Sequence, residues 1–141
     1  MMGHGFLVIK YQMKRKKMTN AFSKYLGPED RIHSAIVEYL KYAQPKALYT
    51  HIANEGKRSK FERYKIKILG LKAGMPDLMF FDRTQTYNGL AIEVKANKNK
   101  VTQAQDFWLK SLEENGWRCA VVYSFEEAKL EIDAYYFKHR R

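Results

Sequence analysis

The chain has 141 residues, and its 26 Lys and Arg against 15 Asp and Glu give a formal net charge of +11. This length predicts one domain with a sizeable core, and the charge favours a polyanionic partner, nucleic acid first and an anionic membrane surface second. Simple solubility is the competing interpretation of the charge. No apolar stretch approaches the ~20 residues that a membrane span needs. The single cysteine, Cys119, excludes an intrachain disulfide and a multi-cysteine zinc site, and we expect a reducing, cytoplasmic setting.

The N-terminal segment, residues 1–27, is basic and is set apart from the domain that we expect over residues 28–141. Its Lys14–Lys17 cluster fits either a phosphate contact or a solvated tail. Pro28 suits the first position of a helix. Apolar residues then recur at helical spacing until Pro45, which predicts a helix with one apolar face.

A predicted strand over residues 48–53 leads into a strongly basic insertion, residues 54–76, with seven Lys and Arg against two Glu. Ser59 and Glu62 have the spacing of a helix capping box, so we predict a short helix that Gly70 ends. Its apolar residues are expected to face inward, and they are Phe61, Tyr64 and Ile68.

The remaining elements alternate between strands and helices. Two strands, over residues 77–82 and 89–96, are separated by turn residues and could pair as a hairpin. A helix opened by Thr102, an apolar strand over residues 118–123 and a helix capped by Ser124 follow. This order predicts an α/β fold with a mixed central sheet of about four strands flanked by helices.

The strand over residues 89–96 carries a polar pattern that points to chemistry. Because successive side chains alternate between the faces of a strand, Glu93 and Lys95 share one face, ~7 Å apart along the strand. Asp77 starts the preceding strand, and hairpin pairing would bring it near Glu93. Two neighbouring carboxylates repel unless a cation lies between them, and their oxygens suit Mg²⁺ or Mn²⁺. The lysine could then hold the attacking water and stabilise negative charge on phosphorus.

An amphipathic strand with a solvated polar face, preceded by an ordinary turn aspartate, is the alternative interpretation. A Glu-x-Lys pattern alone is weak evidence against it. The joint pattern is much rarer, since Pro76-Asp77 opens a strand and Glu-x-Lys follows in an apolar strand after fifteen intervening residues.

Taken together, the motifs resemble the VRR-NUC domain, a branch of the PD-(D/E)XK nucleases. The similarity covers about residues 29–133 and leaves out the basic tail before residue 27. It rests on Gly74-Met75-Pro76-Asp77-Leu78, Gly89-Leu90-Ala91-Ile92-Glu93-Val94-Lys95 and Thr102-x-x-Gln105. Further matches are Asn54-Glu55-Gly56, the helix end at Asn115-Gly116, and Ser124-x-Glu126-Glu127-Ala128.

The resemblance implies a restriction-endonuclease-like fold and metal-dependent cleavage of DNA. Small stand-alone members of the family, often encoded by phages, resemble Holliday junction resolvases and act as homodimers. Longer relatives embed the domain in repair nucleases that cut flaps and crosslinked DNA. Because 141 residues leave no room for such extra domains, we expect a resolvase-like enzyme, acting as a homodimer in a bacterial cytoplasm.

Several further residues have both a functional and a structural interpretation. The family places a glutamate like Glu29 near the metal, whereas its structural role would be interaction with the helix dipole. Gln105 would either reach the active site or only close a capping box with Thr102. Glu55 would support the metal site or simply offset nearby lysines. Candidate DNA phosphate contacts, each more often solvated when taken alone, are Lys57, Arg58 and Lys98.

The sequence therefore predicts a Mg²⁺- or Mn²⁺-dependent endonuclease for structured DNA, with no membrane partner. Asp77 and Glu93 would ligate the metal together with the carbonyl of Val94, and Lys95 would assist the attacking water. The supporting residues would be Gln105 and Glu29. Competing predictions are a flap nuclease and a non-catalytic DNA-binding module on a decayed nuclease fold. A third is a sequence-specific restriction enzyme, which would need a recognition element that only residues 1–27 could supply.

Overall fold

The structure is a computed structural model, and it describes residues 21–53 and 56–138. The basic cluster Lys14–Lys17 and the candidate site residue Glu55 lie outside the described residues. The roles expected of them therefore stay predictions.

Five helices and four strands make up the described part of the chain. They are the 3₁₀ helix η1 (Ala21–Tyr25), α2 (Pro28–Ala43), β1 (Tyr49–His51), α3 (Lys60–Ile68), β2 (Leu78–Phe80), β3 (Leu90–Val94), α4 (Gln103–Glu114), β4 (Arg118–Val122) and α5 (Phe125–Lys138). The elements follow the predicted order, and each strand is shorter than the predicted one. None of the helices in this part of the chain combines the length and the apolar character of a membrane span.

The strands form one mixed sheet in the order β1-β2-β3-β4. β2 pairs antiparallel with both β1 and β3, whereas β3 and β4 are parallel. Parallel neighbours need a crossover connection, and α4 supplies it. The register places Leu78 opposite Ile92 and Phe80 opposite Leu90, which is the predicted hairpin. The predicted α/β fold with a mixed four-stranded sheet is confirmed.

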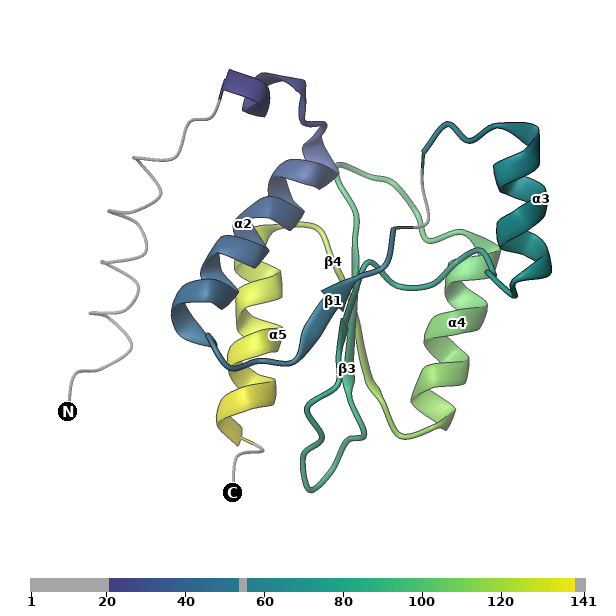
Figure 1. Cartoon of the computed structure of the whole chain (residues 1–141). Coiled ribbons are helices and arrows are strands. Elements are labelled where there is room, and N and C mark those ends of the chain that lie inside the picture. Colours follow the sequence, from purple (N-terminus) through teal and green to yellow (C-terminus); the bar gives the residue numbers. More distant parts are fainter. Residues whose placement is uncertain (1–20, 54–55, 139–141) are drawn as a thin grey trace.

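Helices cover both faces of the sheet. α2 and α5 lie together on one face, and α4 lies on the other (Figure 1). The main core forms between the sheet and the α2–α5 pair. Its fully buried members include Ile36 and Leu40 of α2, Phe80 of β2, Ile92 of β3 and Ile132 of α5.

β3 is buried on both faces, which overturns the alternative of a solvated strand face. Its inward residues Leu90, Ile92 and Val94 belong to the main core, as the alternation predicts. On the opposite face Glu93 is 2% exposed and Lys95 is 8% exposed. Burial of charged groups is costly unless they have partners, so these two side chains require a polar site around them.

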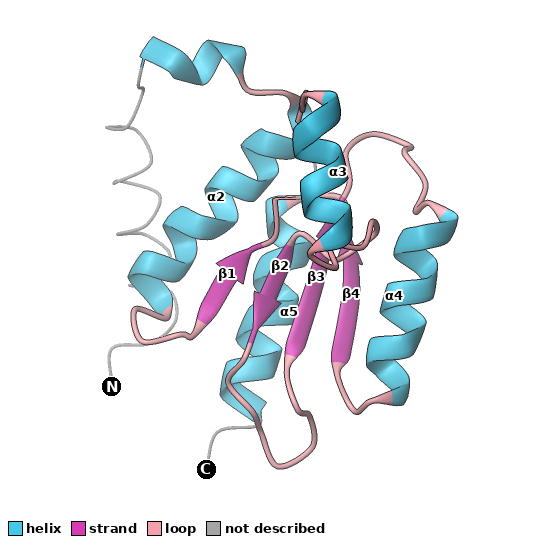
Figure 2. Cartoon of the chain, turned by 45° about the vertical axis from the view of Figure 1, so that its right-hand side comes forward, coloured by secondary structure: helices cyan, strands magenta, loops and turns pink. Residues whose placement is uncertain are grey.

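The helix in the basic insertion forms, but its predicted inward face is wrong. Ser59 caps α3, and its hydroxyl accepts a hydrogen bond from the backbone N–H of Glu62 at 3.1 Å. Phe61, Tyr64 and Ile68 are nevertheless 70%, 61% and 62% exposed. Helical spacing shows which side chains share a face, but it cannot supply a surface for that face to cover. In this structure α3 lies beyond the end of the sheet, and none of its residues is buried (Figure 2).

Candidate active site

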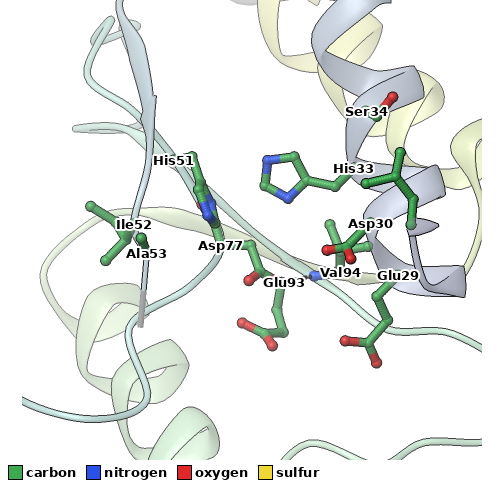
Figure 3. A pocket seen from close by; sticks show the side chains of 11 residues that line it. Glu29, Asp30, His33, Ser34, His51, Ile52, Ala53, Asp77, Glu93 and Val94 are labelled. Atoms are coloured by element: carbon green, nitrogen blue, oxygen red, sulfur yellow. Dashed lines mark hydrogen bonds between the residues drawn. The ribbon is translucent and has the colours of Figure 1, made fainter. Parts of the chain in front are cut away.

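The candidate site lies at one end of the sheet. β1 and β3 both finish there, and β2, which runs the other way, starts there. Asp77 directly precedes β2, and Glu93 is the penultimate residue of β3. A cleft of about 360 Å³ opens at this end, and α2 provides one of its walls (Figure 3). The residues that line it are Leu26, Glu29, Asp30, His33, Ser34, His51, Ile52, Ala53, Asp77, Glu93 and Val94.

Asp77 is fixed by backbone contacts to both neighbouring strands. Its carbonyl accepts a hydrogen bond from the N–H of Ile52 at 2.9 Å, and its Oδ2 accepts one from the N–H of Val94 at 2.7 Å. The preceding turn packs directly on the start of α4. Gly74 has φ +94°, and a Cβ there would come within 2.5 Å of the backbone of Ala104. Only glycine fits this close approach, which holds the Asp77 turn beside α4.

Glu93 lies between Lys95 and Gln105. Its Oε1 is 3.6 Å from the Nζ of Lys95 and accepts a hydrogen bond from the Nε2 of Gln105 at 2.6 Å. The charged groups of Glu93 and Lys95 are thus much closer to each other, at 3.6 Å, than the ~7 Å between the two residues along the strand. The other carboxylate oxygen of Glu93, Oε2, is buried and has no hydrogen-bond partner among the described residues. An unpartnered buried oxygen beside a cleft is a strong indication that a ligand belongs there.

Gln105 both closes the capping box at the start of α4 and contacts Glu93. Its Oε1 accepts a hydrogen bond from the N–H of Thr102 at 2.9 Å, and the Thr102 hydroxyl accepts one from the N–H of Gln105 at 3.2 Å. This reciprocal capping box leaves the Nε2 end of the amide for Glu93. The cap at the start of α4 therefore also orients the carboxylate.

Burial raises the pKa of both acidic groups. The pKa of Glu93 rises from 4.5 to about 8, first because the side chain is desolvated and second because Asp77 is near, while Lys95 opposes the rise. The pKa of Asp77 is raised mainly by desolvation, and its hydrogen bond from Val94 opposes this. A divalent cation between the two carboxylates would relieve both effects, since it favours the ionised forms. The residues present therefore fit an oxygen-ligated divalent metal ion.

Glu29 reaches the same region from the first turn of α2. Its Oε1 accepts hydrogen bonds from the N–H of Ala96 at 3.3 Å and from the Nδ2 of Asn99 at 3.2 Å. Electrostatic interaction with Glu29 contributes to the raised pKa of both Asp77 and Glu93. The structure thus brings the predicted supporting glutamate to the acidic pair, although 63 residues lie between Glu29 and Glu93 in the sequence.

The predicted DNA contacts flank this end of the sheet. Lys57 and Arg58 follow β1, and Lys98 follows β3, so both loops leave the sheet at the end where the acidic pair lies. Lys57 and Lys98 are exposed. Arg58 is half-buried and donates a hydrogen bond from Nη2 to the carbonyl of Ala53 at 3.2 Å.

Two histidines of the cleft were not among the predicted site residues. His33 lies on α2 and His51 ends β1, and their rings meet at a centroid distance of 4.5 Å. Burial lowers the pKa of His33, and proximity to His51 lowers it further. No sequence motif joins the two positions, because only the packing of α2 against the sheet brings them together.

A pH-dependent loss of stability is expected when no metal is bound. Above the ordinary glutamate pKa of 4.5, an unfolded chain releases the proton that folded Glu93 keeps until about pH 8. The folded state then binds more protons, so its stability falls as pH rises through this window. Thermal unfolding in chelator should show this fall, and Glu93→Gln should remove most of it. Asp77, whose pKa is also raised, should leave a smaller slope of the same sign. Equal slopes in the wild type and Glu93→Gln would contradict the assignment.

Comparison with known proteins agrees with this geometry. The sequence profile of the VRR-NUC domain matches residues 14–126, so the match includes part of the basic N-terminal segment, residues 1–27, which the motifs alone leave outside the domain. A solved structure named VRR_NUC domain protein superposes with a TM-score of 0.67 at 26% sequence identity, covering 81% of this chain and 91% of that chain. No curated protein matches significantly. The profile match over most of the chain, together with the shared fold, shows that the chain belongs to the VRR-NUC domain family of nucleases.

Proposed function

We propose that the chain is a Mg²⁺- or Mn²⁺-dependent endonuclease that cuts structured DNA and resolves four-way junctions. The observation that carries the proposal is the buried acidic pair beside Lys95, with Oε2 of Glu93 left without a partner among the described residues. A non-catalytic DNA-binding module would have no need to keep two buried carboxylates, because they oppose the binding of a polyanion. Retention of Asp77, Glu93 and Lys95 therefore favours the enzyme over the decayed-site alternative.

Asp77 and Glu93, with the carbonyl of Val94, would hold the metal ion. When bound, such an ion polarises a phosphodiester and lowers the pKa of water. To bind the ion, the protein must keep both carboxylates ionised and oriented toward it. The N–H of Val94 fixes one oxygen of Asp77, and Gln105 and Lys95 both contact one oxygen of Glu93. These contacts leave Oε2 of Glu93 available as a ligand.

Lys95 has the position expected of a group that handles developing charge. It is nearly buried, so its ammonium acts in a medium where an electrostatic interaction is stronger than in water. Its role would be to orient the attacking water and to stabilise negative charge on the phosphoryl oxygens. Glu29 would act as a positioning residue, since it ties α2 to the turn that follows β3 through Ala96 and Asn99.

Removal of charge from the loop after β1 is expected to weaken the salt dependence of DNA binding. Each phosphate that a protein neutralises adds roughly −0.9 to the slope of log affinity against log salt. The double variant Lys57→Ala, Arg58→Ala should flatten the slope by about that amount for each phosphate it no longer neutralises. Fluorescence anisotropy with duplex DNA across a salt series measures this slope.

The matched control is the double variant Lys46→Ala, Arg83→Ala, because the loops that carry these two residues lie at the opposite end of the sheet. Equal slopes for the two double variants would mean that the loop faces away from DNA.

Two copies of the chain would account for paired cuts, because a four-way junction has two strands to cleave and the described domain offers one acidic pair. A homodimer with twofold symmetry is the simplest arrangement. The exposed apolar side chains of α3 are consistent with a face that meets a second copy. We retain the predicted cytoplasmic setting, which suits the free, half-buried Cys119.

Cleavage of labelled DNAs tests the proposed function. The purified chain is incubated with linear duplex, flap and four-way junction substrates in Mg²⁺, in Mn²⁺ and in chelator. We expect paired cuts in the junction with either ion, none in chelator, and a dimer by light scattering. Full activity in chelator would remove the metal from the mechanism. A strictly monomeric protein that prefers flaps would favour the flap nuclease, and tight binding without cleavage of any substrate would favour the binding module.

A further inference from the structure

The cleft contains a second group of metal-binding side chains beside the acidic pair. His33, His51 and Asp77 each offer a ligand atom, and these atoms all lie within 4.8 Å of one another. His33 comes from α2, His51 from the end of β1 and Asp77 from the turn directly before β2, so three separate parts of the chain converge (Figure 3). Metal–ligand bonds of ~2.0–2.2 Å place the ligands of one ion up to ~4 Å apart, so small side-chain rotations would enclose an ion.

The hydrogen bond of His51 is independent evidence that the group is prepared for a metal. Its Nδ1 lies 2.8 Å from the carbonyl oxygen of Asp77. A carbonyl oxygen can only accept, so Nδ1 must carry the proton. In the neutral ring Nε2 then bears the lone pair. This is the usual arrangement of a metal-binding imidazole, in which a backbone carbonyl fixes the tautomer and the orientation of the ring.

The contact between the two histidine rings also places two imidazoles side by side in the cleft. The His33 and His51 rings are nearly perpendicular, at 84°. The proposed catalytic ion needs neither of them, since its ligands are oxygens of Asp77, Glu93 and Val94. Imidazole nitrogens favour Zn²⁺ and other transition metals over Mg²⁺, which prefers oxygen ligands. The two groups of side chains thus differ in the ions that they select.

We propose that His33, His51 and Asp77 form a second cation site, which takes a divalent transition metal of the Zn²⁺ type. Asp77 is common to this site and to the proposed catalytic site, so binding at one site changes the other. The inference goes beyond the proposed nuclease activity and does not depend on it, because the histidines can bind an ion whether or not DNA is cut.

Titration with Co²⁺, a spectroscopically visible substitute for Zn²⁺, tests the site. The full-length, tag-free chain is titrated in excess Mg²⁺, which occupies the oxygen-ligated site. We expect one equivalent of Co²⁺ to bind with the visible absorption of nitrogen ligation, and Zn²⁺ to displace it. His33→Gln and His51→Gln should each weaken Zn²⁺ binding in calorimetry by at least about 10-fold. Circular dichroism verifies that each variant is folded.

Matched variants separate this site from the other histidines, from Glu93 and from the cysteine. His4→Gln and His139→Gln remove the other two histidines of the chain, and both should bind Co²⁺ as the wild type does. Glu93→Gln, which loses the proposed catalytic ion, should change the Co²⁺ affinity through the shared Asp77 but keep the visible absorption of nitrogen ligation. Cys119→Ser should change nothing, because burial raises the pKa of this thiol to about 12.

Two results would overturn the inference. One is a Co²⁺ spectrum and a Zn²⁺ affinity that His33→Gln and His51→Gln leave unchanged. The other is Co²⁺ bound only by oxygen ligands, which would leave the two rings as a packing contact. A failure of the proposed nuclease function gives a different result. A protein that cuts no DNA but still binds Co²⁺ through both histidines would contradict the nuclease proposal and support the second cation site.

Discussion

Replacement of Lys95 by methionine is expected to lower the single-turnover cleavage rate by ~100- to 1,000-fold, the usual cost of losing one charge-stabilising donor. DNA affinity should hardly change, because Lys95 is one positive charge among 26 Lys and Arg. Methionine is chosen because Lys95 is only 8% exposed, and an unbranched apolar chain fills the same space without the ammonium. The rate is measured in Mn²⁺ and the affinity in Ca²⁺.

The ion pair with Glu93 makes the conditions of this experiment important. Lys95 lowers the pKa of Glu93, so its removal also makes the carboxylate harder to ionise and the metal harder to bind. The comparison therefore belongs above pH 8 and at saturating Mn²⁺, where both proteins carry the ion. Lys46→Met, in the loop before β1 at the other end of the sheet, is the control and should cut at the wild-type rate. A Lys95→Met protein as fast as this control would leave the lysine with a structural role only.

The local parts of the site could be predicted from the sequence because they follow from short-range rules. Alternation along β3 places Glu93 and Lys95 on one face, and antiparallel pairing brings Asp77 to Val94. The capping box of α4 fixes Gln105 at the start of a helix. These features depend on residues close in sequence or on one strand pairing.

Features that depend on packing between distant elements could not be predicted in the same way. The spacing of Glu29 places it on the apolar side of α2, but only the packed structure brings it to Ala96 and Asn99. The meeting of His33 and His51 has the same origin. The exposure of Phe61 on α3 shows the reverse case, in which a clear helical pattern has no surface to pack against. The spacing of apolar residues in the sequence shows which side chains share one face of a helix, but only the packed structure shows whether another element covers that face.

Glu93→Gln is expected to abolish cleavage in Mg²⁺ while high Mn²⁺ restores part of it. Glutamine keeps the size of the side chain, and its amide oxygen can still accept the hydrogen bond from Gln105. The amide nitrogen that replaces the second oxygen cannot serve as a ligand, so the metal site loses one donor. Mn²⁺ tolerates a mixed ligand set better than Mg²⁺ does, which explains the partial rescue. Above pH 8 and once the site is saturated, further Mn²⁺ should not rescue Lys95→Met, because that variant lacks the ammonium and not a metal ligand.

The same substitution should separate a catalytic role from a structural one. Glu38→Gln on α2 removes an equal charge from an exposed ion pair with Lys41, and it should change neither cleavage nor metal binding. In chelator above pH 8, Glu93→Gln should unfold at a higher temperature than the wild type, because it removes a buried charge whose ionisation destabilises the fold. Loss of cleavage with a gain of stability would mark Glu93 as a carboxylate kept for chemistry at a cost to the fold. Full activity in Mg²⁺, or a loss of stability that parallels the loss of activity, would instead mean that the side chain serves the packing of β3 against α4.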